Sequence, residues 1–209
     1  VRWVHARSFP VHDAQGKPYR TAGVVEDITP RKVLEIREEQ EHAILQYLVS
    51  ARPMPEILEK FVLSYEAMFP GMRGSILLLD PDGQHVRTGA APHLPQGYSD
   101  AIDGAAIGPA AGSCGTAAFT GESVMVGDIG TDPRWNDYRA LAFANDLRAC
   151  WSVPIKSVDG QVLGTFAFYF DHPREPSPAE TQAIEHGAQL ASQALQRHFA
   201  AQALQHSEE

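Results

Sequence analysis

The sequence predicts an α+β fold in which a mainly antiparallel sheet is flanked by helices. Short apolar runs typical of strands, such as SILLLD (residues 75–80) and QVLGTFAFYF (residues 161–170), are separated by longer segments with helical spacing. The turn sequences PDGQ and SVDG join predicted strands directly, and connections this short favour antiparallel pairing. With 209 residues, the chain is long enough for one domain with extra elements or for two small domains.

Residues 1–28 are expected to form two strands joined by a turn at DAQGKPY. Two strands alone do not bury enough apolar surface to be stable in water. They must therefore pair with another chain or belong to a domain whose remainder is missing. Because the chain begins at Val1 in the middle of this pattern, we interpret it as a piece of a longer protein.

A helix is expected over residues 29–51, because Thr29 suits an N-cap and Pro30 suits the first helical position. Its apolar residues form a narrow stripe among charged ones, which favours pairing with another helix. A helix that lies on its own domain is the other possibility. The candidate dimer contacts on this stripe are Val33, Ile36, Ile44, Tyr47 and Leu48.

The rest of the chain predicts a helix, two strands, a region of short helices and loops, three strands and a closing helix. The expected segments are helix 56–69, strands 75–80 and 85–92, a short helix near 114–120, strand 123–129, helix 138–146, strands 148–156 and 161–170, and a helix from 177 toward 205.

The closing helix supplies a second candidate dimer surface. Ser177 suits its N-cap and Pro178 its first helical position. Small and aliphatic residues then recur on one stripe, which permits close approach of another helix. The candidate contacts here are Ile184, Ala188, Ala191, Leu195 and Phe199.

Composition disfavours several classes of function. The chain has 17 Lys and Arg against 26 Asp and Glu, and this net charge of −9 disfavours nucleic-acid or anionic-membrane partners. No apolar run approaches the roughly 18 residues of a membrane span. The two cysteines, Cys114 and Cys150, form no CxxC pair, and the nine histidines lack metal-binding spacing. We therefore expect a cytoplasmic protein with reduced thiols, and the sequence names no cofactor.

Two groups of motifs resemble known families. GVVEDITPRK resembles the end of a PAS domain, where a final strand leads into a signalling helix. SILLLD, GSCGTAAFTGESVMVGDI, DPRW, LRACWSVPI and GQVLGTFAFYF together resemble a GAF domain. The resemblance implies this organisation: 1–28, C-terminal strands of a truncated PAS domain; 29–51, a connector helix; 52–176, the GAF core; 177–209, a helix leading to a missing output domain.

The resemblance also implies a twisted antiparallel sheet with helices on one side and a ligand pocket on the other. Similar GAF domains occur in bacterial sensor proteins that end in a diguanylate cyclase of cyclic di-GMP signalling, a phosphodiesterase or a histidine kinase. We therefore expect a non-enzymatic sensory module that binds an unknown small molecule. Its flanking helices would hold a homodimer and transmit the signal to a fused output domain.

Five residues around the irregular region are candidates for the ligand pocket: Cys114, Trp135, Tyr138, Arg148 and Trp151. Arg148 offers a charge for an anionic ligand. Trp151 lies in a strand whose alternation suits plain core packing as well. The motif that cyclic-nucleotide GAF domains carry is incomplete here, since only the fragment FAND resembles it.

Two other functions stay open. Free methionine-R-sulfoxide reductases share the GAF fold and carry a similar CGTA segment, so Cys114 matches a position of that family. Their further cysteine has no counterpart in DPRWNDYRALAFAND, and Cys150 comes later, inside a strand. Cys114 is otherwise a small packed residue at a tight turn. The third possibility is a dimerisation spacer that binds no ligand.

Overall fold

The computed structural model describes residues 3–29, 31, 46 and 52–207, with side chains up to residue 201. The chain divides into two compact units, residues 1–46 and 47–209. The first unit contains an antiparallel hairpin of β1 (Val4–His12) and β2 (Pro18–Asp27). Its turn is held by the Asp13 carboxylate, which accepts hydrogen bonds from the backbone N–H groups of Gln15 and Lys17, each at 2.9 Å. This hairpin matches the two predicted strands.

Of the predicted connector helix, the structure describes Thr29, Arg31 and Gln46 as helical. The Thr29 hydroxyl accepts a hydrogen bond from the backbone N–H of Trp3 at 2.8 Å, which closes the open end of the hairpin. The candidate dimer contacts of this helix lie outside the described residues: Val33, Ile36, Ile44, Tyr47 and Leu48.

The second unit is built on a five-stranded antiparallel sheet in the order β4-β3-β7-β6-β5. This sheet confirms the predicted α+β class. Its strands are β3 (Arg73–Leu79), β4 (Val86–Ala90), β5 (Val124–Val126), β6 (Ala149–Lys156) and β7 (Val162–Phe170).

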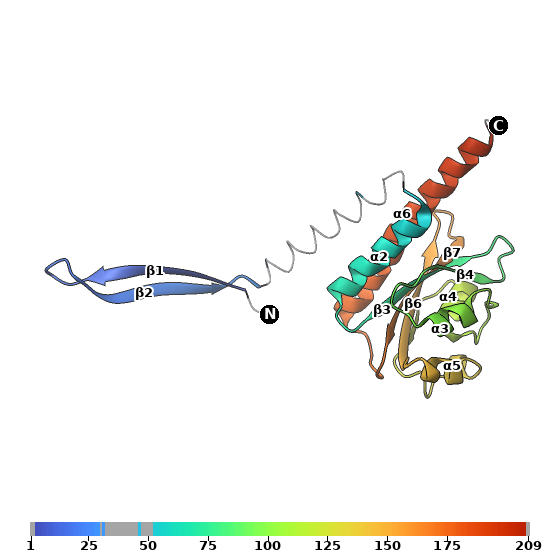
Figure 1. Ribbon diagram of the computed structural model, residues 1–209, viewed down its shortest axis with the longest axis horizontal. Helices are drawn as coiled ribbons and strands as arrows, with labels where there is room; N and C mark the ends of the chain where they lie inside the picture. Colours follow the sequence, from blue (N-terminus) through green and yellow to red (C-terminus); the bar gives the residue numbers. More distant parts are fainter. Residues whose placement is uncertain (1–2, 30, 32–45, 47–51, 208–209) are drawn as a thin grey trace. The chain divides into compact units, whose positions relative to one another are not determined.

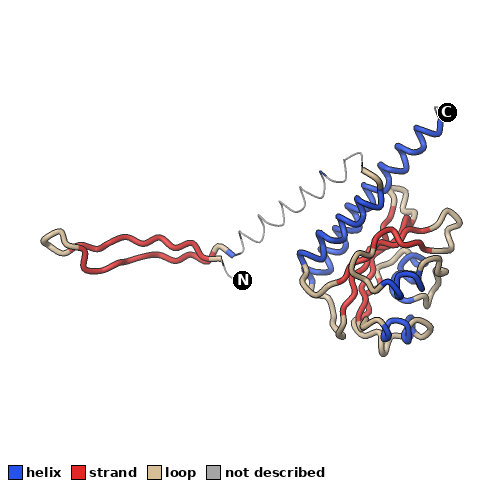
Figure 2. The backbone as a smooth tube through the Cα atoms, viewed as in Figure 1, coloured by secondary structure: helices blue, strands red, loops and turns tan. Residues whose placement is uncertain are grey.

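Helices cover both faces of the sheet, as Figures 1 and 2 show. Helices α2 (Met54–Met68) and α6 (Pro178–Ser207) lie side by side on one face. The other face carries α3 (Gln96–Ile102), α4 (Gly112–Thr120), the 3₁₀ turn η1 (Pro133–Trp135) and α5 (Arg139–Ala144). No helix in the described ranges is both long and apolar enough to cross a membrane.

An aromatic cluster joins α2 to the middle of the sheet. Phe166 of β7 lies 5.4 Å from Phe61 and 5.0 Å from Tyr65, measured between ring centroids, and both contacts are edge to face. Phe168 packs edge to face on Phe166 at 5.0 Å. Alternation along β7 therefore directs these two phenylalanines to the α2 and α6 face, and Ala167 and Tyr169 to the other.

The first half of α6 belongs to the core of the same domain. Of its predicted dimer stripe, Ile184, Ala188, Ala191 and Leu195 are buried within the chain itself. This burial removes them from the proposed dimer contact, because the sheet of their own domain already covers them. Only the fifth candidate, Phe199, remains substantially exposed, at 45%.

The start of α6 has the N-cap that the sequence predicts at Ser177, and Glu180 completes it as a capping box. The Ser177 hydroxyl accepts a hydrogen bond from the Glu180 backbone N–H at 3.3 Å, and the Glu180 carboxylate accepts one from the Ser177 N–H at 2.9 Å. The two contacts satisfy N–H groups that the helix itself leaves unpaired. They fix the residue at which the chain turns from the sheet into α6.

Candidate functional site

A small cavity lies beneath α4, on the face of the sheet opposite α2 and α6. Its inner volume is about 20 Å³, which is room for about one water molecule. None of the described residues that line it is Lys, Arg, His, Asp or Glu. Its aromatic, aliphatic and thiol wall is formed chiefly by Tyr98, Ile102, Cys114, Trp135, Tyr138 and Tyr169.

The first turn of α4 is fixed against both β6 and η1. Gly112 opens the helix with a φ of 64°, a left-handed conformation that favours glycine. The next residue, Ser113, is fully buried. Its hydroxyl donates to the backbone oxygen of Cys150 at 2.9 Å and accepts from Trp135 Nε1 at 3.1 Å. These bonds set the position of Cys114, the residue that follows.

Cys114 lies in a polar group of buried side chains. Its Sγ is 3.2 Å from the Tyr169 hydroxyl. The pKa of Cys114 is lowered to about 7, chiefly because the Cys150 thiol can donate a hydrogen bond to the thiolate. The hydroxyls of Tyr169, Ser152 and Thr165 lower this pKa further, and burial opposes the change. Cys114 is therefore the more readily ionised of the two thiols.

Cys150, Tyr98 and Tyr169 stay neutral near neutral pH. Burial raises the pKa of Cys150 well above its ordinary value, and the adjacent Cys114 thiolate raises it further. Burial likewise raises the pKa of Tyr98 and Tyr169 well above the usual value for tyrosine. The two tyrosine rings meet edge to face, with centroids 5.7 Å apart. The site can thus offer thiol and hydroxyl hydrogen bonds and aromatic faces, but no cation.

Three of the five candidate ligand residues, Cys114, Trp135 and Tyr138, do line this cavity. Arg148 does not. Its guanidinium lies 4.2 Å from the centre of the Phe143 ring and donates to the Leu147 backbone oxygen at 3.2 Å.

Trp151 also lies away from the cavity. It points to the opposite face of β6, where its ring lies 4.5 Å from that of Phe170. Its Nε1 donates to the Arg174 backbone oxygen at 3.3 Å, and the Arg174 guanidinium lies 5.0 Å from the Trp151 ring. Trp151 is therefore core, which is the alternative that its strand position left open.

Sequence reasoning missed Tyr98, Tyr169 and Cys150 as members of the site. A signal for Tyr169 existed, because alternation in QVLGTFAFYF places it opposite Phe168 and Phe170. Cys150 is the register partner of Tyr169 on the neighbouring strand, and that pairing cannot be inferred from either strand alone. Tyr98 comes from a Gly- and Pro-rich segment whose periodicity indicates no face.

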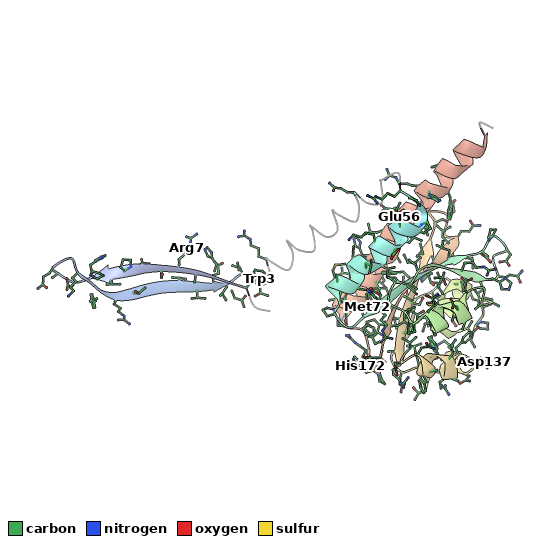
Figure 3. The ribbon with its side chains drawn as sticks, viewed as in Figure 1. Trp3, Arg7, Glu56, Met72, Asp137 and His172 are labelled. Atoms are coloured by element: carbon green, nitrogen blue, oxygen red, sulfur yellow. The ribbon has the colours of Figure 1, made fainter. Side chains whose placement is uncertain are left out.

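The acidic residues Asp128 and Asp132, near α5, stabilise local turns through hydrogen bonds and an ion pair. The Asp128 carboxylate accepts from the Gly130 N–H at 2.7 Å, and Asp132 forms an ion pair with Arg134 at 2.5 Å. Asp137 is exposed at the surface of the domain (Figure 3). Across the described part of the chain, no three His, Cys, Asp or Glu side chains gather into a group that could hold a metal ion.

Comparison with known families and sequences gives consistent results. Residues 51–196 match the family described as GAF domain. A methyl sulfide methyltransferase-associated sensor from Methanosarcina acetivorans is 36% identical over 208 residues, which is all of this chain and 21% of the sensor. A Nif-specific regulatory protein from Azotobacter vinelandii is 26% identical over 168 residues, 79% of this chain and 32% of the regulator. The chain thus spans a third or less of each relative.

Solved structures show the same fold. The GAF domain of an Acinetobacter phosphoenolpyruvate-protein phosphotransferase superposes with a TM-score of 0.62 at 17% identity, covering 79% of this chain and 96% of that domain. A free methionine-R-sulfoxide reductase from Neisseria meningitidis, solved with its substrate, gives 0.63 at 17% identity, covering 81% and 93%. At these identities the likeness concerns the fold alone.

Proposed function

The chain belongs to the GAF domain family, and we propose that it is the sensory module of a larger signal-transduction protein, with the cavity beneath α4 as its ligand site. The observation that carries this proposal is the small cavity, whose described lining includes no Lys, Arg, His, Asp or Glu, on the face of the sheet away from α2 and α6. The homologous proteins, described as a sensor and a regulatory protein, support the same class of function.

The chemistry of the cavity wall indicates a small, uncharged ligand. The Tyr98 and Tyr169 hydroxyls can each donate a hydrogen bond, and the rings of Trp135 and Tyr138 offer flat apolar contact. A cyclic nucleotide or another anion would meet no cationic side chain there, and burial of an unpaired charge is costly. The proposed ligand therefore has a hydrogen-bond acceptor and few non-hydrogen atoms.

Strand β7 is the proposed link between the cavity and the helices. Tyr169 lines the cavity, while Phe166 and Phe168 of the same strand pack against the α2 side chains. A ligand that displaces Tyr169 must shift β7, and tight packing on the other face passes that shift to α2 and α6. The size of the response is limited by the difference in ligand affinity between the two arrangements.

We further propose a cytoplasmic homodimer fused to an output domain such as a diguanylate cyclase, a phosphodiesterase or a histidine kinase. Since Ile184 to Leu195 already pack inside the domain, the dimer contact falls to the connector, residues 29–51, and to the exposed end of α6 near Phe199. Light scattering should give the mass of two chains; a monomer at high protein concentration would contradict the dimer.

The hairpin fits the proposal that residues 1–28 complete a PAS domain. Large apolar side chains are exposed on it, including Trp3 at 45%, Phe9 at 56% and Val25 at 68%. Figure 3 labels Trp3, just before β1 at the open end of the hairpin, and Arg7 within β1. A two-stranded ribbon with such side chains needs a larger sheet to be stable. The sensor from M. acetivorans aligns over the hairpin as well as the GAF region, which supports a common arrangement.

Native mass spectrometry of the purified chain tests the ligand site. We expect a small molecule that stays bound under native conditions and is lost on denaturation. Its binding should change the fluorescence of Trp135, so the signal should disappear in Trp135→Phe and survive in Trp151→Phe, whose ring lies on the other face. A chain without a bound molecule, and without a Trp135 response to any of a series of small neutral compounds, would favour the ligand-free spacer.

A thiol enzyme is the second candidate function, and the thiolate character of Cys114 is the observation that favours it. Free methionine sulfoxide carries an ammonium and a carboxylate group, and the cavity lining offers no charged partner for either. Turnover of free methionine-R-sulfoxide should therefore be absent. Turnover by the purified chain that is lost in Cys114→Ala would overturn the sensor proposal.

A further inference from the structure

The two cysteines of the chain belong to one buried cluster beneath α4, although 36 positions separate them in sequence. Cys114 lies in the first turn of α4 and Cys150 near the start of β6, and both are buried free thiols. The hydroxyl of Ser113 binds the backbone oxygen of Cys150, so the two peptide segments are held together beside the thiols. Tyr169, the register partner of Cys150, touches the Cys114 sulfur.

Several buried groups favour ionisation of Cys114. The Tyr169 hydroxyl lies 3.2 Å from its sulfur. Ser152 and Thr165 are fully buried, and their hydroxyl oxygens have no hydrogen-bond partner. After the Cys150 thiol, the hydroxyls of Tyr169, Ser152 and Thr165 lower the pKa of Cys114. The start of α4 adds the favourable dipole of a helix N-terminus. These contacts explain why Cys114 ionises more readily than Cys150, whose burial keeps it protonated.

We propose that Cys114 and Cys150 form a reversible redox pair, in which hydrogen peroxide oxidises Cys114 and the oxidised sulfur is captured by Cys150 as an intrachain disulfide. Cys114 lines the cavity, which has room for a molecule of about the size of water. Hydrogen peroxide is close to this size, whereas a bulky organic hydroperoxide is not.

The chemistry balances in two steps. The Cys114 thiolate attacks one oxygen of the peroxide and the O–O bond breaks. The other oxygen leaves as hydroxide, takes up the proton that Cys114 released, and becomes water, while Cys114 carries an S–OH group. The Cys150 sulfur then attacks the Cys114 sulfur, the S–O bond breaks, and the hydroxide leaves as water with the Cys150 proton. Two thiols are oxidised to one disulfide and one peroxide is reduced to two waters; a dithiol reductant restores the thiols by exchange.

The disulfide would join α4 directly to β6 and would remove the Cys114 thiol from the cavity wall. The oxidation state would therefore alter the same cavity in which we propose ligand binding. The redox pair itself does not depend on any ligand, because its parts are the thiols and the hydroxyls of the chain. It can be correct whether or not a small molecule binds.

The test is a count of free thiols after peroxide treatment of the whole reduced chain. Treated protein is unfolded in iodoacetamide, and its intact mass shows whether it carries alkyl groups on both cysteines or on neither. We expect hydrogen peroxide to remove both alkylation sites in most molecules, dithiothreitol to restore them, and peptide mapping to find Cys114 joined to Cys150. We also expect tert-butyl hydroperoxide to react more slowly.

Serine variants separate the two steps. Cys150→Ser keeps a hydrogen-bond donor beside Cys114 but cannot form the disulfide, so peroxide should leave an S–OH group that dimedone traps at Cys114. Cys114→Ser should lose both the trapped adduct and the disulfide. The wild-type thiol count decides the matter even where a variant fails to fold. Retention of both thiols, a disulfide between two chains, or oxidation of Cys114 with Cys150 still free would each overturn the proposal.

Discussion

Gly187 lies where α6 comes closest to the sheet, and we expect Gly187→Ala to destabilise the domain. A Cβ atom at this position would lie 2.6 Å from Cε1 of Phe166 and 2.9 Å from Cζ of Tyr65. The two rings are buried and already pack edge to face on each other at 5.0 Å. Because the interior is close-packed, neither ring can move aside without displacing its other neighbours.

The size of the loss follows from two opposing terms. Alanine in place of glycine inside a helix normally adds about 1 kcal/mol of stability. Extra atoms in a filled core cost about 1–3 kcal/mol, and the three atoms within 3.0 Å of the added Cβ place Gly187 at the upper end of this range. The net change is a loss of about 2 kcal/mol in the free energy of unfolding.

Urea unfolding of the wild type and the variant measures this loss as a lower midpoint at an unchanged slope. The matched control is Gly97→Ala in α3, where a Cβ would meet only the Asn145 side-chain oxygen at 3.9 Å. That variant should be neutral or more stable by up to about 1 kcal/mol. A Gly187→Ala protein that unfolds at the wild-type midpoint or above it would refute the close approach of α6 to β7.

Three further predictions concern the site and the start of α6. Ser113→Ala should lower the free energy of unfolding by about 1–3 kcal/mol, because Trp135 Nε1–H loses its buried acceptor. In urea unfolding, the same substitution should cause a smaller loss when Trp135 is already Phe. An equal loss in both backgrounds would contradict the hydrogen bond between Trp135 and Ser113. The reduced protein should gain stability as the pH rises from 7 to about 8.5. The reason is that the pKa of Cys114 is about 7 in the folded state and about 8.5 in the unfolded state. Ionisation of Cys114 at full extent then favours folding by about 2 kcal/mol. That contribution is lost as the pH falls through 7, and an identical gain in Cys114→Ala would exclude Cys114 as its source. Ser177→Ala should lower the free energy of unfolding by about 1 kcal/mol in the urea assay, because it removes the cap of α6. An unchanged urea midpoint would count against the cap that Ser177 shares with Glu180.

Local features of the sequence predicted the fold well. The apolar runs and the short turns PDGQ and SVDG identified the hairpins, because strand alternation and turn conformation are set by adjacent residues. The cap at Ser177 was predictable for the same reason. The stripe on α6 correctly indicated a buried face, but a stripe does not show which surface covers it. Here the chain's own sheet covers Ile184 to Leu195, so they were wrongly taken as dimer contacts.

The candidate site was only partly predictable, because it is assembled from elements that are distant in sequence. Cys114, Trp135 and Tyr138 come from the irregular region that separates β4 from β6, and all three reach the cavity. Trp151 was misjudged because a one-residue difference along β6 decides between the two faces of the sheet. Cys150, one position earlier, faces the site instead. Only the register between β6 and β7 brings it beside Tyr169.

Coupling between the cavity and the two long helices through β7 can be measured directly by hydrogen exchange. In Cys150→Ser protein, methyl methanethiosulfonate places a methylthio group on Cys114 alone, inside the cavity. Coupling predicts altered exchange in α2 and in the buried part of α6, residues 183–195, together with the change in α4. Altered exchange confined to α3 and α4, with α2 and α6 exchanging at their unmodified rates, would contradict the link.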